Sequence, residues 1–368
     1  MAPHPDRPAK RNSNVTDPNA KAGAAPANGA FIEVLRPTPD RPALRRYVPR
    51  APANTHAELA ARDVLDWREA PPEPGLPDIA PVQDKIICGA AEASLRALPD
   101  ESVACVITSP PYWNIVDYGF EGQLGTGTYE EYIGELLGVW RQCERILEPN
   151  GKLCINVPIM PIAKSVMPGQ HTRHIKNLSS DIEGAILAEL ALERFSLYAW
   201  QKQTTEKMFG SYPYPPNIFE QNTLEFINVL VKPGKPKTLP PAIKEASRLT
   251  QKQWMNLSQQ VWRLYPADVK RAAHPAPFPE ALPNRLVAMY TFAACAAGDV
   301  TFPGDVVVDP FCGTGATCVA AKRLGRHYVG IDLSVDFTVR AQERSSATER
   351  DDSIFMCHSS RVSGSSHE

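Results

Sequence analysis

The chain of 368 residues carries VDPFCGTGAT at positions 308–317, and this stretch decides the expected fold. It ends an apolar, β-branched run typical of a buried strand and opens an apolar helical pattern at 318–324. Glycines at such a turn let the backbone approach a ligand closely, and the free amides of the helix N-terminus lie beside it. A second strand pattern, HYVGID at 327–332, ends in an acid that is placed to accept hydrogen bonds from ribose hydroxyls. The stretch therefore predicts a nucleoside site.

Two phosphate-binding alternatives fit this turn less well. The run lacks the Gly-Lys-Ser/Thr ending that would hold a nucleotide tail, and the third glycine of a dinucleotide fingerprint is missing. A nucleoside whose tail is cationic and free of phosphate fits the pattern better. A glycine turn that only packs a helix on a sheet is the plain alternative.

A second motif, TSPPYW at 108–113, directly follows the strand pattern at 103–107. In an open parallel sheet the ligand crevice lies at the carboxyl ends of the strands, so this loop and the glycine turn can face each other. Two prolines make the loop rigid and remove amide donors. We expect Ser109 Oγ and the Pro110 carbonyl to accept the two hydrogens of an aromatic amine, and Tyr112 to stack on the ring that carries it. A proline turn beside a buried aromatic pair is the structural alternative.

Apolar runs at 85–88, 103–107, 153–157 and 305–309 are short and do not alternate with polar residues, which is typical of parallel strands covered on both faces. Between the second and third run, residues 129–147 show apolar residues at helical spacing and end at Pro149-Asn150-Gly151. Strand, helix and strand in this order predict a right-handed crossover in an α/β fold.

Composition sets the expected boundaries. Residues 1–80 are rich in Pro, Ala, Asn and Arg and are predicted to form a disordered arm, apart from one short helix near residues 57–67. The catalytic domain is predicted to span 82–345, followed by a flexible tail at 346–368. We therefore expect a deletion of residues 1 to about 75 to leave the activity intact.

The overall charge and the cysteines exclude several classes. The net charge is −2, so nucleic acid would have to meet a local basic patch. The eight cysteines include no CxxC pair, there is no signal peptide, and no apolar stretch approaches 18 residues. We expect a cytoplasmic protein without disulfides, a membrane span or a bound metal.

Together the two motifs resemble those of the DNA amino-methyltransferases, whose catalytic loop is (Asp/Asn/Ser)-Pro-Pro-(Tyr/Phe) and whose cofactor loop is Asp-Pro-Phe-x-Gly-x-Gly. The catalytic loop comes first in this chain, and this circularly permuted order marks the β group of that family. The resemblance implies a seven-stranded methyltransferase (Rossmann-like) sheet with one antiparallel strand, and S-adenosyl-L-methionine as the cofactor. It also implies site residues, which are catalytic Ser109, Pro110, Pro111 and Tyr112 and cofactor-binding Asp309, Phe311, Gly313, Gly315, Thr317 and Asp332.

One departure from the family pattern lies after the first strand. Many members have Gly-Asp there, with the carboxylate near the adenine amino group of the cofactor. This chain has Gly89-Ala90 instead, so Glu92 is the candidate replacement for that carboxylate.

The serine in the catalytic loop resembles the cytosine-N4 members more than the adenine-N6 members, which remain the alternative. Cytosine-C5 chemistry is excluded because it needs a Pro-Cys thiolate and the sequence has no Pro-Cys. A methyltransferase acting on RNA or protein and a catalytically dead DNA-binding module are the rivals from other classes.

The resemblance implies double-stranded DNA as the partner, and basic residues suggest where it is met. A target-recognition region is predicted at 233–273, where Lys235, Lys237, Arg248 and Arg263 belong to a local basic patch. Arg173 and Lys176 form a second candidate. A cognate restriction enzyme would be another chain, and the oligomeric state stays open, with a homodimer among the alternatives.

Overall fold

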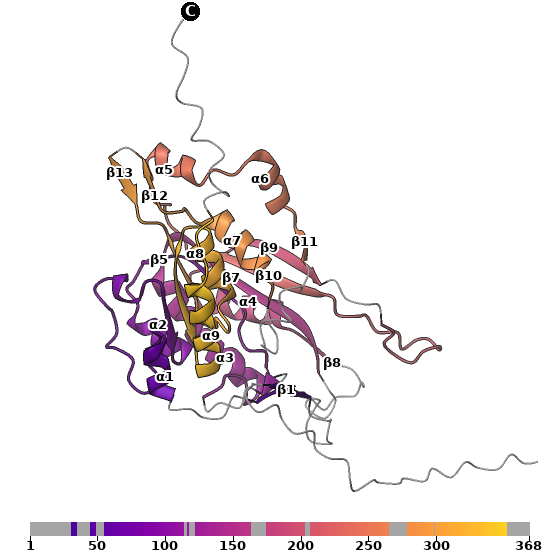
Figure 1. Ribbon diagram of the computed structural model, residues 1–368. Helices are drawn as coiled ribbons and strands as arrows, with labels where there is room; N and C mark the ends of the chain where they lie inside the picture. Colours follow the sequence, from indigo (N-terminus) through magenta and orange to yellow (C-terminus); the bar gives the residue numbers. More distant parts are fainter. Residues whose placement is uncertain are drawn as a thin grey trace, which may run out of the picture.

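The computed structural model describes residues 31–34, 45–48, 55–113, 116–117, 122–162, 174–202, 207–264, 278–297 and 299–351. Within these ranges a large, mostly parallel sheet runs through the middle of the molecule, with helices on both sides (Figure 1). The predicted α/β fold class is confirmed.

Seven neighbouring strands form the centre of this sheet, and their order is β9-β10-β7-β5-β14-β15-β4. Only β10 runs antiparallel to its two neighbours among these seven, as predicted. Three additions enlarge the sheet: β11 extends it beside β9, β3 extends it beside β4, and β8 pairs with the end of β7. The strand bounds are β3 Leu65–Asp66, β4 Lys85–Cys88, β5 Val103–Thr108, β7 Leu147–Ile162, β8 His174–Asn177, β9 Glu193–Lys202, β10 Leu224–Val231, β11 Val261–Leu264, β14 Val306–Asp309 and β15 His327–Asp332.

Two hydrophobic clusters cover the two faces of the sheet, because successive strand residues point to opposite sides. Val308 belongs to one cluster and its neighbour Val307 to the other. The first cluster is closed by α2 (Ala91–Ala97), α3 (Tyr129–Ile146) and α4 (Leu178–Glu189). The second is closed by α1 (Thr55–Ala61), α7 (Ala281–Tyr290), α8 (Ala316–Arg323) and α9 (Val335–Ser346). Among the helices in the described ranges, none combines the length and the apolar character needed to cross a membrane.

The crossover helix α3 agrees with its predicted range to within one residue. Its first turn is closed by a capping box, in which Thr128 accepts from the amide of Glu131 and the Glu131 side chain accepts from the Thr128 amide. Such a cap satisfies donors that the first helical turn leaves unpaired. The helix is therefore well placed to support the catalytic loop that precedes it.

The structure corrects the predicted disordered arm over residues 55–80. Leu59 on α1 is fully buried, and β3 pairs in parallel with β4 at the edge of the sheet. Short strands are also present at β1 (Phe31–Val34) and β2 (Arg45–Val48), and β2 pairs with β6 (Val116–Asp117). The composition of the whole segment does not predict these short elements, because a few apolar residues are enough to pack one short helix against an existing core. The other residues of the arm, and the tail from residue 352, lie outside the described residues.

The remaining elements form a subsidiary layer after β10. They are α5 (Pro241–Ala246), α6 (Gln251–Leu257), β12 (Cys295–Ala297) and β13 (Val300–Phe302), with a 3-10 turn at Ala80–Val82 earlier in the chain. Since β10 is antiparallel, the chain leaves it at the edge where the parallel strands begin. The carbonyl of Lys232, which directly follows β10, accepts from the amide of Asn150 in the first part of β7 at 2.9 Å, as this direction requires.

Candidate active site

The two motif loops lie side by side because β5 and β14 are neighbours in the sheet. At their ends, the Thr108 hydroxyl donates to Asp309 Oδ1 at 2.7 Å, between residues 201 positions apart in the chain. The sequence prediction that the loops face each other is borne out by this contact.

The glycine loop holds the acid at the end of β15. The amide of Gly313 donates to one Asp332 oxygen and the amide of Ser334 donates to the other, each at 2.9 Å. Burial raises the pKa of Asp332 to about 6, against the opposing effect of these amide hydrogen bonds. Asp332 is therefore a carboxylate that a cationic or hydrogen-bond-donating ligand would stabilise.

Gly315 explains why the loop needs glycine. Its φ of +80° is unfavourable for other residues, and a Cβ at this position would lie 2.9 Å from Ala341 Cβ on α9. The turn thus brings α8 and α9 together closely beneath the loop.

Asp309 lies inside the protein rather than on the pocket wall. Thr317 donates to Asp309 Oδ2 at 2.7 Å, and the Phe311 amide donates to Asp309 Oδ1 at 3.1 Å. Burial raises the pKa of Asp309 to about 6, and the hydrogen bonds from Thr108, Thr317 and Phe311 oppose this rise. Neither Asp309 nor Thr317 lines the pocket described next. The geometry gives these two residues the role of joining the loops.

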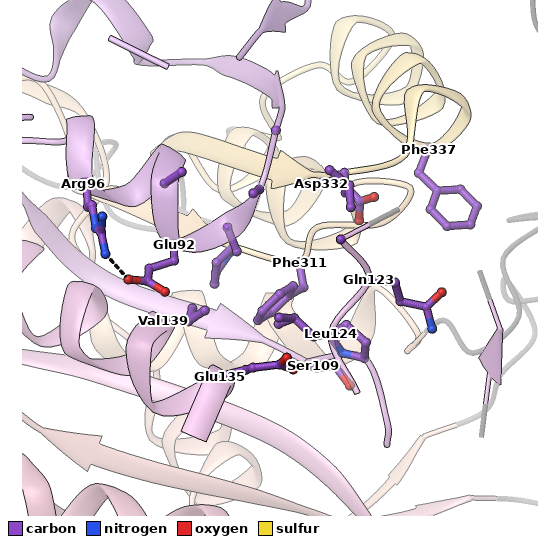
Figure 2. Close-up of a pocket in the computed structure, with 18 residues that line it drawn as sticks. Glu92, Arg96, Ser109, Gln123, Leu124, Glu135, Val139, Phe311, Asp332 and Phe337 are labelled. Carbon is purple, nitrogen blue, oxygen red and sulfur yellow. Dashed lines mark hydrogen bonds and ion pairs between the residues drawn. The ribbon is translucent and has the colours of Figure 1, made fainter. Parts of the chain in front are cut away.

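A cavity of about 390 Å³ opens in front of both loops. Figure 2 shows the Phe311 side chain projecting into its centre, with Asp332 and Phe337 to one side and Glu92 and Glu135 to the other. Trp140 of α3 supports the Phe311 ring edge-on, with 6.3 Å between the ring centroids. Aromatic and aliphatic walls suit a purine, and carboxylates suit a cationic tail.

Glu92 projects into this cavity from α2. It is the candidate replacement for the acid that the family carries after Gly89 and that this chain lacks. Its carboxylate pairs with Arg96 one turn along the helix. Gly138 on α3 makes room for it, because a Cβ there would lie 2.6 Å from Glu92 Oε2. Glu135, which sequence reasoning missed, lines the same cavity and accepts from the Gly125 amide at 3.2 Å.

Hydrogen bonds fix the two polar side chains at the centre of the catalytic loop, Ser109 and Tyr112. The Ser109 hydroxyl donates to the Asn156 carbonyl at 2.9 Å, so its oxygen lone pairs remain for an incoming donor. Tyr112 Oη lies 2.9 Å from Ser109 Oγ and donates to Glu225 Oε2 at 3.3 Å. These contacts fix the orientation of the Tyr112 ring.

The backbone of the loop is fastened to α3. The Tyr132 hydroxyl donates to the Pro111 carbonyl at 2.8 Å, so this carbonyl is engaged within the protein. Trp113 Nε1 donates to the Gly127 carbonyl at 2.9 Å, and the Trp113 ring meets Tyr129 edge-on. Pro110 is buried in the same loop.

Glu225 is a functional candidate that sequence reasoning missed. It is 5% exposed at the start of β10, accepts from Asn156 Nδ2 at 2.5 Å, and pairs with Lys202 at the end of β9. Its run, LEFINVLV, is a clear strand pattern. Glu225 is the one acid in that pattern, and this could have marked it as a candidate, since a buried acid is usually paired or functional.

The predicted DNA contacts fall at two different edges of the sheet. Lys237 pairs with Glu148, which lies near the start of β7, and with Asp305, which directly precedes β14. Lys235 and Arg248 belong to the same stretch after β10, so these three residues lie at the edge opposite the catalytic loop. The antiparallel direction of β10 thus separates these residues from the catalytic loop, and their contact with DNA stays a prediction.

Two other predicted contacts lie closer to the catalytic edge. Arg263 is exposed on β11, whose next residue, Leu264, pairs with Lys202. Lys176 lies on β8, with its Nζ 3.8 Å from the centroid of the Tyr129 ring. Arg173 and residues 265–277 lie outside the described residues.

Comparison with known proteins agrees with this geometry. Residues 103–343 match the family described as DNA methylase. The type II methyltransferase M.SmaI of Serratia marcescens is 30% identical over 291 residues, covering 71% of this chain and 90% of that protein. M.MjaI of Methanocaldococcus jannaschii, also a type II methyltransferase, is 28% identical, covering 68% of this chain and 86% of that protein.

Solved structures that are similar in fold include the following two. TTHA0409 of Thermus thermophilus, solved in complex with S-adenosyl-L-methionine, is 32% identical, with a TM-score of 0.56 over 71% of this chain and 94% of that one. The cytosine-N4-specific PvuII DNA methyltransferase is 18% identical, with a TM-score of 0.51 over 73% of this chain and 88% of that one, a likeness in fold alone.

Proposed function

This chain belongs to the DNA methylase family and uses S-adenosylmethionine, and from this we propose that it methylates the exocyclic N4 amine of cytosine in duplex DNA. The observation that carries the choice of base is Ser109 at the head of the catalytic loop. Serine at this position resembles the cytosine-N4 enzymes, and its hydroxyl hydrogen is already directed to the Asn156 carbonyl.

The pocket fits the cofactor by its chemistry. Asp332 is proposed to accept from the ribose hydroxyls, and Phe311 to contact the adenine. Glu92 is proposed to accept from the adenine amino group, and Glu135 to face the positively charged part of the molecule. Gly313 and Gly315 shape the loop, while Asp309 and Thr317 act from behind it. The bound cofactor supplies a methyl group on a cationic sulfur.

The chain's own residues prepare the amine of the flipped base. Ser109 Oγ and the Pro110 carbonyl are proposed to accept its two hydrogens, so that the nitrogen lone pair turns out of the ring system toward the methyl carbon. Tyr112 is proposed to stack on the base, with its ring held by Ser109 and Glu225. A nucleophilic cysteine has no part in this scheme, and Cys312 is a buried free thiol.

The experiment that tests the base is chemical analysis of the product. DNA from cells expressing the chain is digested to nucleosides and examined by mass spectrometry, and long-read sequencing of the same DNA gives the sequence context. N4-methylcytosine is the expected product. N6-methyladenine would overturn the choice of base, and transfer to RNA or protein alone would overturn the choice of substrate.

Variants of the loop test the direct-attack scheme. Ser109→Ala should lower kcat more than it changes KM, because the hydrogen bond is used most in the transition state. Tyr112→Ala should weaken capture of the base by about 1 to 3 kcal/mol. Cys312→Ala is the control and should retain transfer; a complete loss of transfer with cofactor still bound would point to a thiolate mechanism.

A further inference from the structure

An arm between β9 and β10 exposes apolar side chains to solvent. Met208, Tyr212, Tyr214 and Ile218 are 76%, 77%, 75% and 79% exposed. Figure 1 shows that the described part of this arm, residues 207–223, reaches well beyond the body of the molecule. Large apolar side chains so fully exposed, and gathered on one element, indicate an interaction site.

The tip of the arm, residues 208–219, has a defined backbone. Gly210 and Ile218 form an antiparallel bridge, and the Ser211 amide donates to the Asn217 carbonyl at 2.8 Å. The Tyr214 amide closes a turn on the Ser211 carbonyl at 2.9 Å. Gly210 has a φ of +108°, and a Cβ there would overlap the Asn217 carbonyl oxygen. The tip therefore presents its side chains from a closed turn.

The base of the arm adjoins the catalytic loop. Lys202, the last residue of β9, pairs with Glu225 at the start of β10, and Glu225 accepts from Tyr112. The Lys202 amide also donates to the Thr223 carbonyl at 2.7 Å. The arm thus leaves the sheet at the edge where the flipped base is proposed to be held.

The low charge of the arm indicates which kind of contact it makes. Residues 207–223 contain one basic residue, Lys207, and one acid, Glu220. Phosphate binding needs clustered basic residues, so the backbone of DNA is a poor partner for this element. Apolar side chains inserted between or beneath bases are the alternative means of holding a distorted duplex.

We propose that the tip of this arm is a wedge that enters duplex DNA beside the target and stabilises the duplex from which the base has been extruded. Tyr212, Tyr214 and Ile218 fill the vacated stack or contact the orphaned partner base. The proposal rests on the proposed function, because base extrusion is needed only if a base inside duplex DNA is the substrate.

The test compares two substrates for the wild type and for Tyr212→Ala, Tyr214→Ala and Ile218→Ala. One duplex carries the target site fully paired; the other has an abasic position opposite the target, where extrusion is easier. On the paired duplex each variant should lose about 10-fold or more in kcat/KM, the order of one stacking contact. On the abasic duplex most of that loss should disappear.

Trp254→Ala and Met255→Ala are matched controls, since these exposed residues (66% and 59%) lie on α6, which follows β10 toward the opposite edge. They should leave both rates unchanged. Equal losses on both duplexes, or no loss at all, would refute the wedge. A change from dimer to monomer in the arm variants, with the ratio of rates unchanged, would also refute it and make the arm an interface between copies.

Binding separates this proposal from the proposed function. Affinity for abasic against intact duplex can be measured without methyl transfer. The wild type should prefer the abasic duplex, and the arm variants should prefer it more strongly, because they weaken binding to the intact duplex most. Failure of the wild type to yield methylated DNA would count against the proposed function alone. An equally strengthened abasic preference in the Trp254 and Met255 controls, or an unchanged preference in the arm variants, would count against the wedge.

Discussion

The Thr108 hydroxyl donates its hydrogen to the buried Asp309 carboxylate at 2.7 Å, which ties the strand of the catalytic loop to the strand of the cofactor loop. Asp309 has a pKa raised to about 6 by burial, and this hydrogen bond opposes the rise. The consequence is that the alignment of the two loops and the ionisation of one acid are coupled.

Thr108→Val should therefore destabilise the protein in a pH-dependent way. Removing the Thr108 donor raises the pKa of Asp309 further. A carboxyl group whose pKa is higher in the folded than in the unfolded state makes the protein less stable as the pH rises toward the folded-state pKa. The expected cost is about 1 to 3 kcal/mol, larger at pH 8 than at pH 5, measured by urea unfolding. Thr338→Val is the control, because this buried hydroxyl donates to backbone carbonyls; an equal pH dependence there would contradict the coupling.

Cofactor affinity should depend on the ionisation of Asp332. Its pKa is raised to about 6, and a bound cation or hydroxyl donor favours the ionised form. Affinity should accordingly weaken as pH falls from 8 to 5, and binding near pH 5 should release a proton, seen in calorimetry as a dependence of enthalpy on the buffer. Asp332→Asn should bind more weakly and lose most of this pH dependence, whereas the exposed Asp299→Asn should behave as wild type.

Glu225 is expected to act through Tyr112. Glu225→Gln removes the charge that pairs with Lys202 and weakens the contact with the phenol, at a cost of about 1.5 to 3 kcal/mol in kcat/KM. Tyr112→Phe should lose less activity, since the ring is kept. The double variant should be no worse than Glu225→Gln, because both substitutions act on the same hydrogen bond between Tyr112 and Glu225.

Additive losses in that cycle would show that Glu225 acts independently of Tyr112. Ser179→Ala controls for general damage to β10, since it removes a buried hydrogen bond of 2.9 Å to Asn228 on the same strand. It should leave cofactor binding and methyl transfer close to wild type.

Leu59→Ala tests whether residues 55–80 belong to the folded body. A fully buried leucine replaced by alanine costs about 2 to 5 kcal/mol, whereas the half-exposed Leu197→Ala should cost little. A deletion through residue 75 should lower the thermal midpoint at least as much as Leu59→Ala. An unchanged midpoint would mean that the deletion is harmless, as the composition of the segment predicts.

The sequence predicts most of what short-range patterns determine. The strands at 85–88 and 327–332 and the helix at 129–147 follow from apolar runs and their stop signals, and the structure confirms them. The contact between the two loops follows from the rule that crevices form at the carboxyl ends of strands.

What the sequence could not predict depends on direction and on distant partners. The basic stretch after β10 suggests a DNA contact by its charge, but the antiparallel direction of that strand carries Lys237 to the opposite edge. Glu225 escapes sequence reasoning because its partner Tyr112 lies 113 positions earlier. Leu59 escapes it because burial against a core formed elsewhere leaves no local signature.

The neighbouring position of β5 and β14 also bears on how the protein is made. Residue 309 is synthesised 201 positions after its partner Thr108, an interval of roughly 10 to 40 s at ordinary rates of translation. Throughout that interval, the side of β5 that will receive β14 is an unpaired strand edge, the kind of surface on which chains associate wrongly. The pocket in front of the two loops can therefore form only after β14 and β15 have been translated, that is, through Asp332.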